Sequence, residues 1–379
     1  MKESLLPPRN LIVVLLVILT LGVLAALTFP RFANVHPSPL TVVIYAAQDQ
    51  VYAEPILREF EKETGIKVKA VYDSEAVKTV GLANRLLAER SHPQCDLFWG
   101  NEEMRTRQLA AQSVFRETNG WAAFGYRSRR IVINTNFVAA GILPAVEGGI
   151  LPPGSASEIS ARSVTSNAIP PGWKPGSTAG KMPAATSLLE LTNEIWRGKI
   201  ALAFPQFGTT ATHFHALKQL WGEERWLDWC RALAANKPFI VDGNSVVVKF
   251  IARGEAWIGL TDSDDIAAGQ REGLPVAALP LIPSLSPADG ERVVDGQVRR
   301  ESLLIPNTVA VIRNAPHPEA AQRLFEYLQR HEVAEMLVQA NALESPATAN
   351  EINALRPDWA ALLRDLETTT KQLNEIFLR

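Results

Sequence analysis

Short apolar segments alternate with amphipathic helices after residue 40, and this alternation restricts the fold more than any other feature. Leu40–Tyr45 and Ile66–Tyr72 are apolar enough to be buried strands, and Glu54–Glu63 between them has apolar residues at helical spacing. Pro55 lies in the first turn of this helix, and Gly65 ends it. A β-α-β unit of this length predicts two parallel strands with the helix packed on their sheet.

The same alternation continues along the chain. Residues 75–90 have the pattern of an amphipathic helix, and Cys95–Trp99 and Arg130–Asn134 have the pattern of further strands. The predicted fold is therefore α/β, with a mainly parallel sheet covered by helices on both faces. Ligands bind at the carboxyl ends of the strands in such sheets. This rule selects three candidate binding loops, at residues 46–49, 73–74 and 100–102.

A second α/β lobe is predicted beyond residue 187. Its strands are expected at Lys199–Ala203 and Ala256–Leu260, with helices at about 210–221 and 226–235. Towards the end of the chain, a strand pair or one long bent strand is expected over residues 303–312. Three helices are expected after it, over residues 319–328, 332–339 and 357–378. The expected organisation is a first lobe of residues 40–135 with about 300–345, a second lobe of residues 136–299, and C-terminal helices over 346–379.

The interval 141–187 differs in composition from the rest of the second lobe. It is rich in Pro, Gly, Ser and Ala and has little apolar periodicity, so we expect a loop or a disordered insertion. Two roles stay open for it, a partner-binding arm and a tolerated surface insertion.

The run Leu11–Phe29 is uncharged and almost entirely aliphatic. About 20 apolar residues in a helix are long enough to cross a bilayer, so residues 11–30 predict a transmembrane anchor, with a cleaved signal segment as the alternative. Lys2 and Arg9 place residues 1–10 in the cytoplasm. After a tether over residues 31–39, the remainder is expected on the periplasmic or extracytoplasmic face of the cytoplasmic membrane.

Charge and cysteine content exclude several classes of protein. The 379 residues are 47% hydrophobic and 21% charged, which suits a globular chain with two domain cores. A formal net charge of -2 provides no field that would attract nucleic acid, so no such partner is expected. Cys95 and Cys230 predict two buried hydrophobic side chains, with one long-range disulfide as the alternative. The tryptophans are expected in cores, although Trp99 is a candidate for lining a cleft.

Two loops of the second lobe precede predicted helices. Phe207–His213 follows a strand and opens a helix, so Thr209 and Thr210 either bind an anion or carboxylate or act only as helix caps. Asn244 and Ser245 stand before the next helix and have the same two interpretations.

A third loop, Thr261–Asp265, places three carboxylates at the carboxyl end of a strand. Their mutual repulsion requires a compensating cation or hydrogen-bond donors. The chain lacks the motifs of a nucleophilic or zinc hydrolase, so we expect a protein that is not an enzyme. A metal-dependent hydrolase using Asp264, Asp265 and His213 is the alternative, and His215 is expected to be solvent-exposed or to act as a cap.

Six segments occur in a fixed order over most of residues 40–345: VVIYAAQDQVYAEPILREFEKETGIKVKAVYD, CDLFWGNEE, GKIALAFPQFGTTATHFHALKQLWGEE, VDGNSVVV, ARGEAWIGLTDSDD and LLIPNTVAVIRNAPHPEAA. Together they resemble family 1 extracellular solute-binding proteins of the ferric-iron-type ABC importers. The resemblance implies the two-lobe type II periplasmic-binding-protein fold, in which two α/β lobes close on a ligand like a hinged clamp.

The resemblance also implies a set of binding positions. Ferric members of the family hold iron with a histidine, a glutamate and two adjacent tyrosines. By position, Asp49 stands for the histidine, Asn101 for the glutamate with Glu102 beside it, and Asp264 and Asp265 for the tyrosines. Without phenolates, this chain departs from the ligand set that makes the family selective for ferric iron.

The accompanying anion loop of the family resembles Gly208–Thr210, and its neighbouring asparagines resemble Asn244 and Asp262. The predicted site therefore consists of ten residues: Gln48, Asp49, Asn101, Glu102, Thr209, Thr210, Asn244, Asp262, Asp264 and Asp265. Four of these are the candidate metal ligands: Asp49, Glu102, Asp264 and Asp265. Oxygen ligands suit a hard metal cation, and also an organic cation or a zwitterion.

The predicted function is the extracytoplasmic solute-binding component of an ABC importer. It would capture a metal ion of the iron type, or a small cationic or zwitterionic solute, and deliver this cargo to a permease and its ATPase. The protein is expected to be a monomer. No resident cofactor is expected, because the metal ion would be cargo. A membrane-tethered sensor that passes its signal to a receptor is the alternative.

Overall fold

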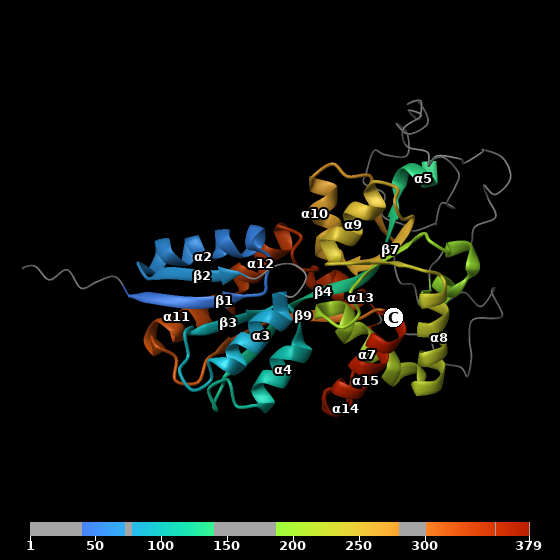
Figure 1. Cartoon of the computed structure of the whole chain (residues 1–379). Coiled ribbons are helices and arrows are strands. Elements are labelled where there is room, and N and C mark those ends of the chain that lie inside the picture. The colour runs from blue at the N-terminus through green and yellow to red at the C-terminus, as the bar shows by residue number, and fades with distance from the viewer. Residues whose placement is uncertain (1–39, 73–77, 140–186, 280–300, 353, 379) are drawn as a thin grey trace, which may run out of the picture. The chain divides into compact units, whose positions relative to one another are not determined.

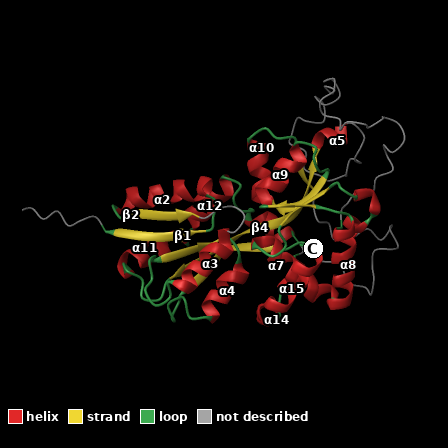
Figure 2. Ribbon diagram, in the orientation of Figure 1, coloured by secondary structure: helices red, strands yellow, loops and turns green. Residues whose placement is uncertain are grey.

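Nine strands of the computed structural model form one hydrogen-bonded sheet within its described residues, which are 40–72, 78–139, 187–279, 301–352 and 354–378 (Figure 1). The strand order is β2-β1-β3-β9-β4-β7-β5-β6, and β8 pairs with β4 (Figure 2). The strands are β1 Thr41–Ala46, β2 Lys67–Tyr72, β3 Leu97–Gly100, β4 Trp121–Asn134, β5 Ile200–Ala203, β6 Phe239–Val241, β7 Ile258–Asp262, β8 Val276–Leu279 and β9 Leu304–Val311.

The helices that cover this sheet are α2 Gln50–Thr64, α3 Lys78–Ala88, α4 Glu103–Ala111, α5 Thr135–Ala139, α7 Gly208–Trp221, α8 Glu223–Ala235, α9 Asn244–Ala252, α10 Ser263–Arg271, α11 Pro318–Leu328, α12 His331–Gln339, α13 Pro346–Glu351, α14 Trp359–Arg364 and α15 Leu366–Phe377. Two short 3-10 helices are η2 Leu188–Thr192 and η3 Glu194–Trp196. Within the described part, no helix combines the length and the apolar character that a membrane span requires. The predicted anchor at Leu11–Phe29 and residues 141–186 of the predicted insertion lie outside the described residues.

Two groups of elements, which we call the first and second lobes, each pack helices on both faces of parallel strands. In the first lobe, β2, β1 and β3 run parallel, with α2, α11 and α12 on one face and α3 and α4 on the other. In the second lobe, β6, β5 and β7 run parallel, with α9 and α10 on one face and α7 and α8 on the other. The predicted α/β architecture is confirmed.

Strands β4 and β9 connect the two lobes and run antiparallel to their neighbours. The first part of β4 pairs with β9, and its second part pairs with β7 and β8. The register shifts between Phe124 and Tyr126, where Gly125 has a φ of 56° that a side chain would strain. The sequence pattern predicted only Arg130–Asn134 of β4, because the residues before it lack an apolar alternation.

The C-terminal elements and three short elements differ from the expectations. Residues 303–312 contain one strand, β9, so the interpretation as a strand pair was wrong. The long helix expected over 357–378 is divided at Asp365 into α14 and α15. The short elements α4, β6 and β8 were not predicted, because three to nine residues display too little periodicity.

The cysteines and Trp99 are core residues. Cys95 and Cys230 are both free and fully buried, so the alternative of a disulfide was wrong. Trp99 is also completely buried and packs against Phe124 in the first-lobe core. It therefore does not line a solvent-accessible cleft.

Candidate functional site

Two predicted binding loops of the first lobe lead directly into helices. Asp49 is the N-cap residue of α2 but makes no side-chain capping hydrogen bond. Glu102 is the N-cap of α4, and its Oε1 accepts a hydrogen bond of 3.0 Å from the backbone N–H of Arg105. Burial raises the pKa of Glu102, against the lowering effect of the Arg105 charge. These loops therefore hold carboxylates at helix N-termini, where the helix dipole favours negative charge.

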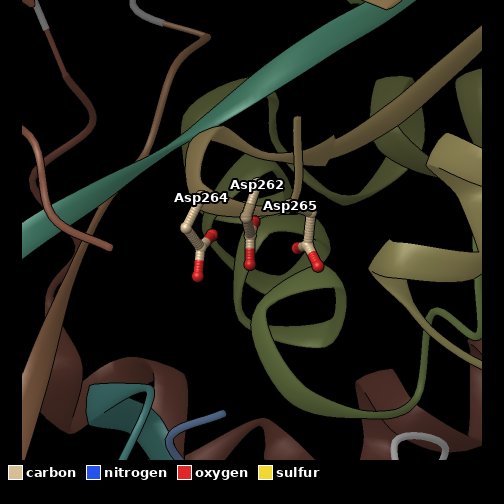
Figure 3. A group of neighbouring side chains, drawn as sticks. All are labelled: Asp262, Asp264 and Asp265. Carbon is tan, nitrogen blue, oxygen red and sulfur yellow. The ribbon is translucent and has the colours of Figure 1, made fainter. Parts of the chain in front are cut away.

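Three buried carboxylates lie together where β7 ends and α10 begins. Asp262, Asp264 and Asp265 each offer an oxygen within 4.8 Å of the others (Figure 3). Asp262 and Asp264 are almost completely buried, and Asp265 is 8% exposed. The predicted grouping of the three acids is therefore found, and their proximity requires a compensating charge.

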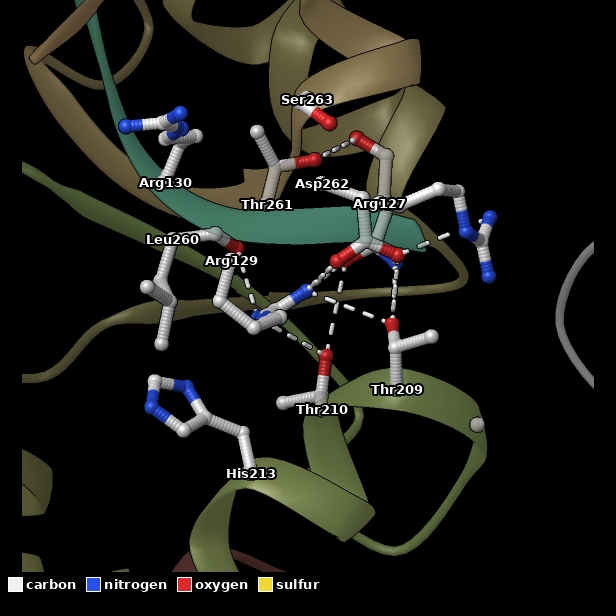
Figure 4. Close-up of polar contacts among 12 residues, drawn as sticks. Arg127, Arg129, Arg130, Thr209, Thr210, His213, Leu260, Thr261, Asp262 and Ser263 are labelled. Atoms are coloured by element: carbon white, nitrogen blue, oxygen red, sulfur yellow. Dashed lines mark hydrogen bonds and ion pairs between the residues drawn. The ribbon is translucent and has the colours of Figure 1, made fainter. Parts of the chain in front are cut away.

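Arg129 of β4 supplies one compensating charge. Its Nη1 lies 2.6 Å from Oδ1 of Asp262, and the arginine is completely buried (Figure 4). The other oxygen of Asp262 accepts hydrogen bonds from the Thr209 hydroxyl at 2.7 Å and from the Asn244 amide at 3.1 Å. Arg129 also donates to the Thr210 hydroxyl at 3.3 Å. Four predicted site residues thus surround one arginine that the sequence analysis did not select.

Arg127, two residues earlier on the same strand face, supplies the second charge. Its Nη1 lies 2.9 Å from Oδ2 of Asp264, and its Nη2 donates to the backbone carbonyl of Asn101. Tyr52 of α2 donates to the backbone carbonyl of Asp264 at 3.2 Å. Because Asn101 and Tyr52 belong to the first lobe, these bonds join it to α10 of the second lobe.

Burial and arginine charge act in opposite directions on the aspartates. Burial alone raises the pKa of Asp262, but the charges of Arg129 and Arg127 outweigh it and leave the pKa below its usual value. For Asp264, burial prevails over the charge of Arg127 and raises the pKa to about 6. Asp262 is therefore the more firmly ionised of the two at neutral pH.

The predicted capping roles in the second lobe are wrong. The N-cap of α7 is Phe207, whereas Thr209 and Thr210 lie inside the first turn. The N-cap of α9 is Gly243, and Asn244 is the first helical residue. The hydroxyls of Thr209 and Thr210 and the amide of Asn244 instead form hydrogen bonds with the Asp262–Arg129 pair.

Both histidines of α7 are buried, so the expectation that His215 is exposed or acts as a cap was wrong. His213 Nε2 lies 2.7 Å from the Glu301 carbonyl, and His215 Nδ1 lies 3.4 Å from the Ala211 carbonyl. Burial lowers the pKa of each imidazole to about 3. Both rings are therefore neutral and contribute to the structure of α7.

The four candidate metal ligands do not form one group in the described part of the chain. The acidic group with metal-ligand spacing contains Asp264 and Asp265 together with Asp262, but neither Asp49 nor Glu102. The Glu102 carboxylate accepts a hydrogen bond of 3.0 Å from the Thr212 hydroxyl of α7. The negative charge of Asp49 contributes to the raised pKa of Asp264, which places Asp49 within electrostatic reach of the cluster.

Comparisons with known proteins agree with this architecture. A family model described as bacterial extracellular solute-binding protein matches residues 40–340. Iron-bound HitA from Pseudomonas aeruginosa superposes with a TM-score of 0.63 at 17% identity, covering 88% of this chain and 99% of HitA. AfuA from Actinobacillus pleuropneumoniae, with fructose-6-phosphate bound, superposes with a TM-score of 0.66 at 15% identity. This match covers 89% of this chain and 98% of AfuA. These likenesses confirm the two-lobe periplasmic-binding-protein fold.

A sequence relative is also known. An uncharacterized protein of Haemophilus influenzae is 23% identical over 242 residues. The match spans 62% of this chain and 62% of that relative.

Proposed function

The chain belongs to the bacterial extracellular solute-binding proteins, and we propose on this premise that it is the solute-binding component of an ABC importer. It would capture a small solute between its lobes and deliver it to a permease and the associated ATPase. The observation that carries the proposal is the buried Arg127, which contacts Asn101 of the first lobe and Asp264 of the second. A site that spans two lobes joined by two strands suits a protein that closes on its ligand.

Further contacts between the lobes support a closing motion. Arg271 of α10 donates from Nη2 to the Tyr52 hydroxyl at 2.6 Å and from Nη1 to the Ala340 carbonyl at 2.6 Å. Thr212 of α7 reaches Glu102 on the opposite lobe. Opening would break these bonds. A ligand that binds the closed arrangement more tightly than the open one would therefore stabilise the closed arrangement.

Ferric iron is one candidate cargo. It is favoured by the Asp262, Asp264 and Asp265 cluster and by structural relatives such as iron-bound HitA. Binding a metal there would require these acids to exchange the arginines for the cation, because Arg127 and Arg129 already lie within 3 Å of two of them. A cationic or zwitterionic solute would have to displace the arginines from these acids in the same way.

Membrane attachment and a role as a carrier without catalysis complete the proposal. The Leu11–Phe29 run supports an anchor or a cleaved signal, and the family supports a location outside the cytoplasm. A tethered sensor is the alternative function, and transport of a labelled solute with the cognate permease would separate the two.

Changing Asp264→Asn together with Asp265→Asn is expected to abolish solute-induced stabilisation while the protein remains folded. Asparagine keeps the size and part of the hydrogen bonding, but it removes the Asp264 charge that pairs with Arg127 and the Asp265 charge that also acts on Arg127. A solute at about 100 times its dissociation constant should stabilise the parent chain by about 2.7 kcal/mol and the double variant by almost nothing. Thermal unfolding with a broad solute library, including ferric citrate and fructose-6-phosphate, measures this difference.

The matched control is Asp228→Asn, which alters an exposed carboxylate paired with Arg231. It is expected to retain the full thermal shift, because this pair lies on the outer surface of α8. An equal thermal shift in the Asp264→Asn, Asp265→Asn variant would refute the proposed site.

A further inference from the structure

Three buried carboxamides have no hydrogen-bond partner among the described residues. Gln48 and Asn307 are completely buried, and Gln206 is 3% exposed. The oxygen and the nitrogen of each side-chain amide are all unpaired. Buried polar groups are nearly always hydrogen-bonded in native proteins, because a buried unpaired amide is costly. A ligand bound between the lobes of a binding protein would supply such a partner.

Two of these amides lie beside the same strand end of the first lobe. Gln48 follows Ala47, whose backbone N–H donates to the Trp99 carbonyl at 2.8 Å. Asn307 precedes Thr308, which pairs with Gly100 at the end of β3. Gln48 and Asn307 therefore flank the loop that begins at Gly100, which is a predicted binding loop of this lobe.

The third amide belongs to the segment of the second lobe that leads into α7. Gln206 lies two residues before α7, and Thr212 of that helix donates to Glu102 at 3.0 Å. Arg127 reaches the same loop through its hydrogen bond to the Asn101 carbonyl. The three unpaired amides thus belong to the segments that meet around residues 100–102, within the proposed binding site.

The chemistry of a carboxamide restricts the ligand. A metal cation would satisfy only the amide oxygen, and a simple anion would satisfy only the NH2 group. A hydroxyl group both donates and accepts, so a ligand with several hydroxyls satisfies both halves of each amide. Both arginines of the site already have a carboxylate partner, because Arg127 pairs with Asp264 and Arg129 pairs with Asp262. The three amides therefore offer neutral, two-way hydrogen bonding beside the charged cluster.

We infer that the site takes a polyhydroxylated solute, a sugar or its phosphate ester, and that Gln48 and Asn307 bind its hydroxyls from the first lobe. Gln206 binds the solute from the second lobe. Each NH2 group donates to a ligand hydroxyl oxygen, and each amide oxygen accepts a ligand O–H. The inference rests on the proposed function, since it names the class of solute for the same site.

The test compares Gln48→Met and Asn307→Leu with the parent in the purified full-length chain. Isothermal titration calorimetry is carried out with D-glucose, D-glucose 6-phosphate, D-ribose 5-phosphate, inorganic phosphate and ferric citrate. At least one sugar or sugar phosphate is expected to bind, and each variant is expected to weaken that binding about tenfold or more. Comparing glucose with glucose 6-phosphate shows whether a phosphate ester is required.

Unfolding of the free variants distinguishes ligand binding from a structural role. An apolar side chain of similar size removes an unpaired buried amide, so the melting temperature of the free protein should stay the same or rise. Gln112→Met, at an exposed carboxamide after α4, is expected to leave both binding and stability unchanged.

Several outcomes would overturn the inference: sugars that fail to bind, variants that bind them as tightly as the parent, or free variants that melt well below it. Binding of ferric citrate or inorganic phosphate alone would remove the sugar class but leave the proposed solute-binding function intact. Failure of every solute in the broad library would remove both.

Discussion

Replacement of Arg129 by methionine is expected to lower the free energy of unfolding by about 3–5 kcal/mol, because it leaves a buried carboxylate without its partner. Arg129 is completely buried, and its Nη1 lies 2.6 Å from Oδ1 of Asp262. The charges of Arg129 and Arg127 are what keep the pKa of Asp262 low in spite of burial. Methionine fills much of the volume but offers neither a charge nor a donor. Equilibrium unfolding in urea measures the loss.

Two further variants separate charge compensation from packing. Adding Asp262→Asn to Arg129→Met removes the stranded charge and is expected to restore much of the lost stability. Arg330→Met breaks an ion pair of 2.7 Å to Glu63 on the surface, where water solvates both groups, so its unfolding midpoint should stay close to that of the parent. If the unfolding midpoint of Arg129→Met were also close to that of the parent, Arg129 would not have the proposed role of compensating the charge of Asp262.

The fold was predictable where one face of an element is buried and the other is exposed. The helix α2 buries Ile56, Leu57 and Phe60 at helical spacing and leaves charged residues outside, which is the pattern that predicted it. The strand β1 is apolar because helices cover both of its faces. Local periodicity therefore identified the longer elements with one buried face, such as α2, and their order along the chain.

The connection between the lobes was less predictable. The first half of β4 has the sequence WAAFGYRSR, in which a glycine bulge interrupts the alternation and arginines point into the site. A strand that crosses between lobes packs against different partners along its length, so it lacks a single buried face. The carboxylates of Asp262 and Asp264 require a cation or hydrogen-bond donors beside them. The arginines that supply these, Arg127 and Arg129, lie in this unassigned stretch. Their spacing of two, which puts both on one strand face, was the available signal.

The histidines of α7 were misjudged for a related reason. Residues two apart on a helix do point in different directions, which led to the expectation that His215 faces solvent. In the structure, every residue from Thr209 to Leu217 is buried. The helix packs against α8 and α15 and also contacts α3 and α14, so direction no longer determines exposure. Such burial on all sides depends on tertiary contacts that local periodicity does not contain.

Acidification is expected to destabilise the chain through these two histidines. Burial lowers the pKa of His213 and His215 to about 3, whereas an unfolded histidine has a pKa of about 6.5. Between these values the unfolded chain binds more protons than the folded chain. Stability is therefore fully present above about pH 6.5 and is lost as the pH falls towards 3. At about pH 5, each histidine should reduce the free energy of unfolding by about 2 kcal/mol, measured by urea unfolding across this range.

Substitutions separate the effect of the two histidines on the free energy of unfolding from the effect of Asp264. Acidification lowers this free energy through the histidines and raises it through Asp264. The pKa of Asp264 is raised to about 6, so protonation of this group favours the folded chain as the pH falls from about 6 to 4. His215→Phe keeps the ring volume and is expected to remove about half of the histidine-dependent loss. His92→Asn, at an exposed position, should leave the acid dependence unchanged.

Direct titration of the imidazole rings by NMR provides the decisive measurement for this prediction. The ring resonances of His213 and His215 are expected to keep their neutral-state positions down to about pH 4, as long as the protein is folded. This holds because the part of α7 from Thr209 to Leu217 is buried, and charging either ring would require water or an acid beside it. A ring that titrates near the ordinary histidine pKa in the folded protein would contradict burial as the cause, since it would show that α7 admits water.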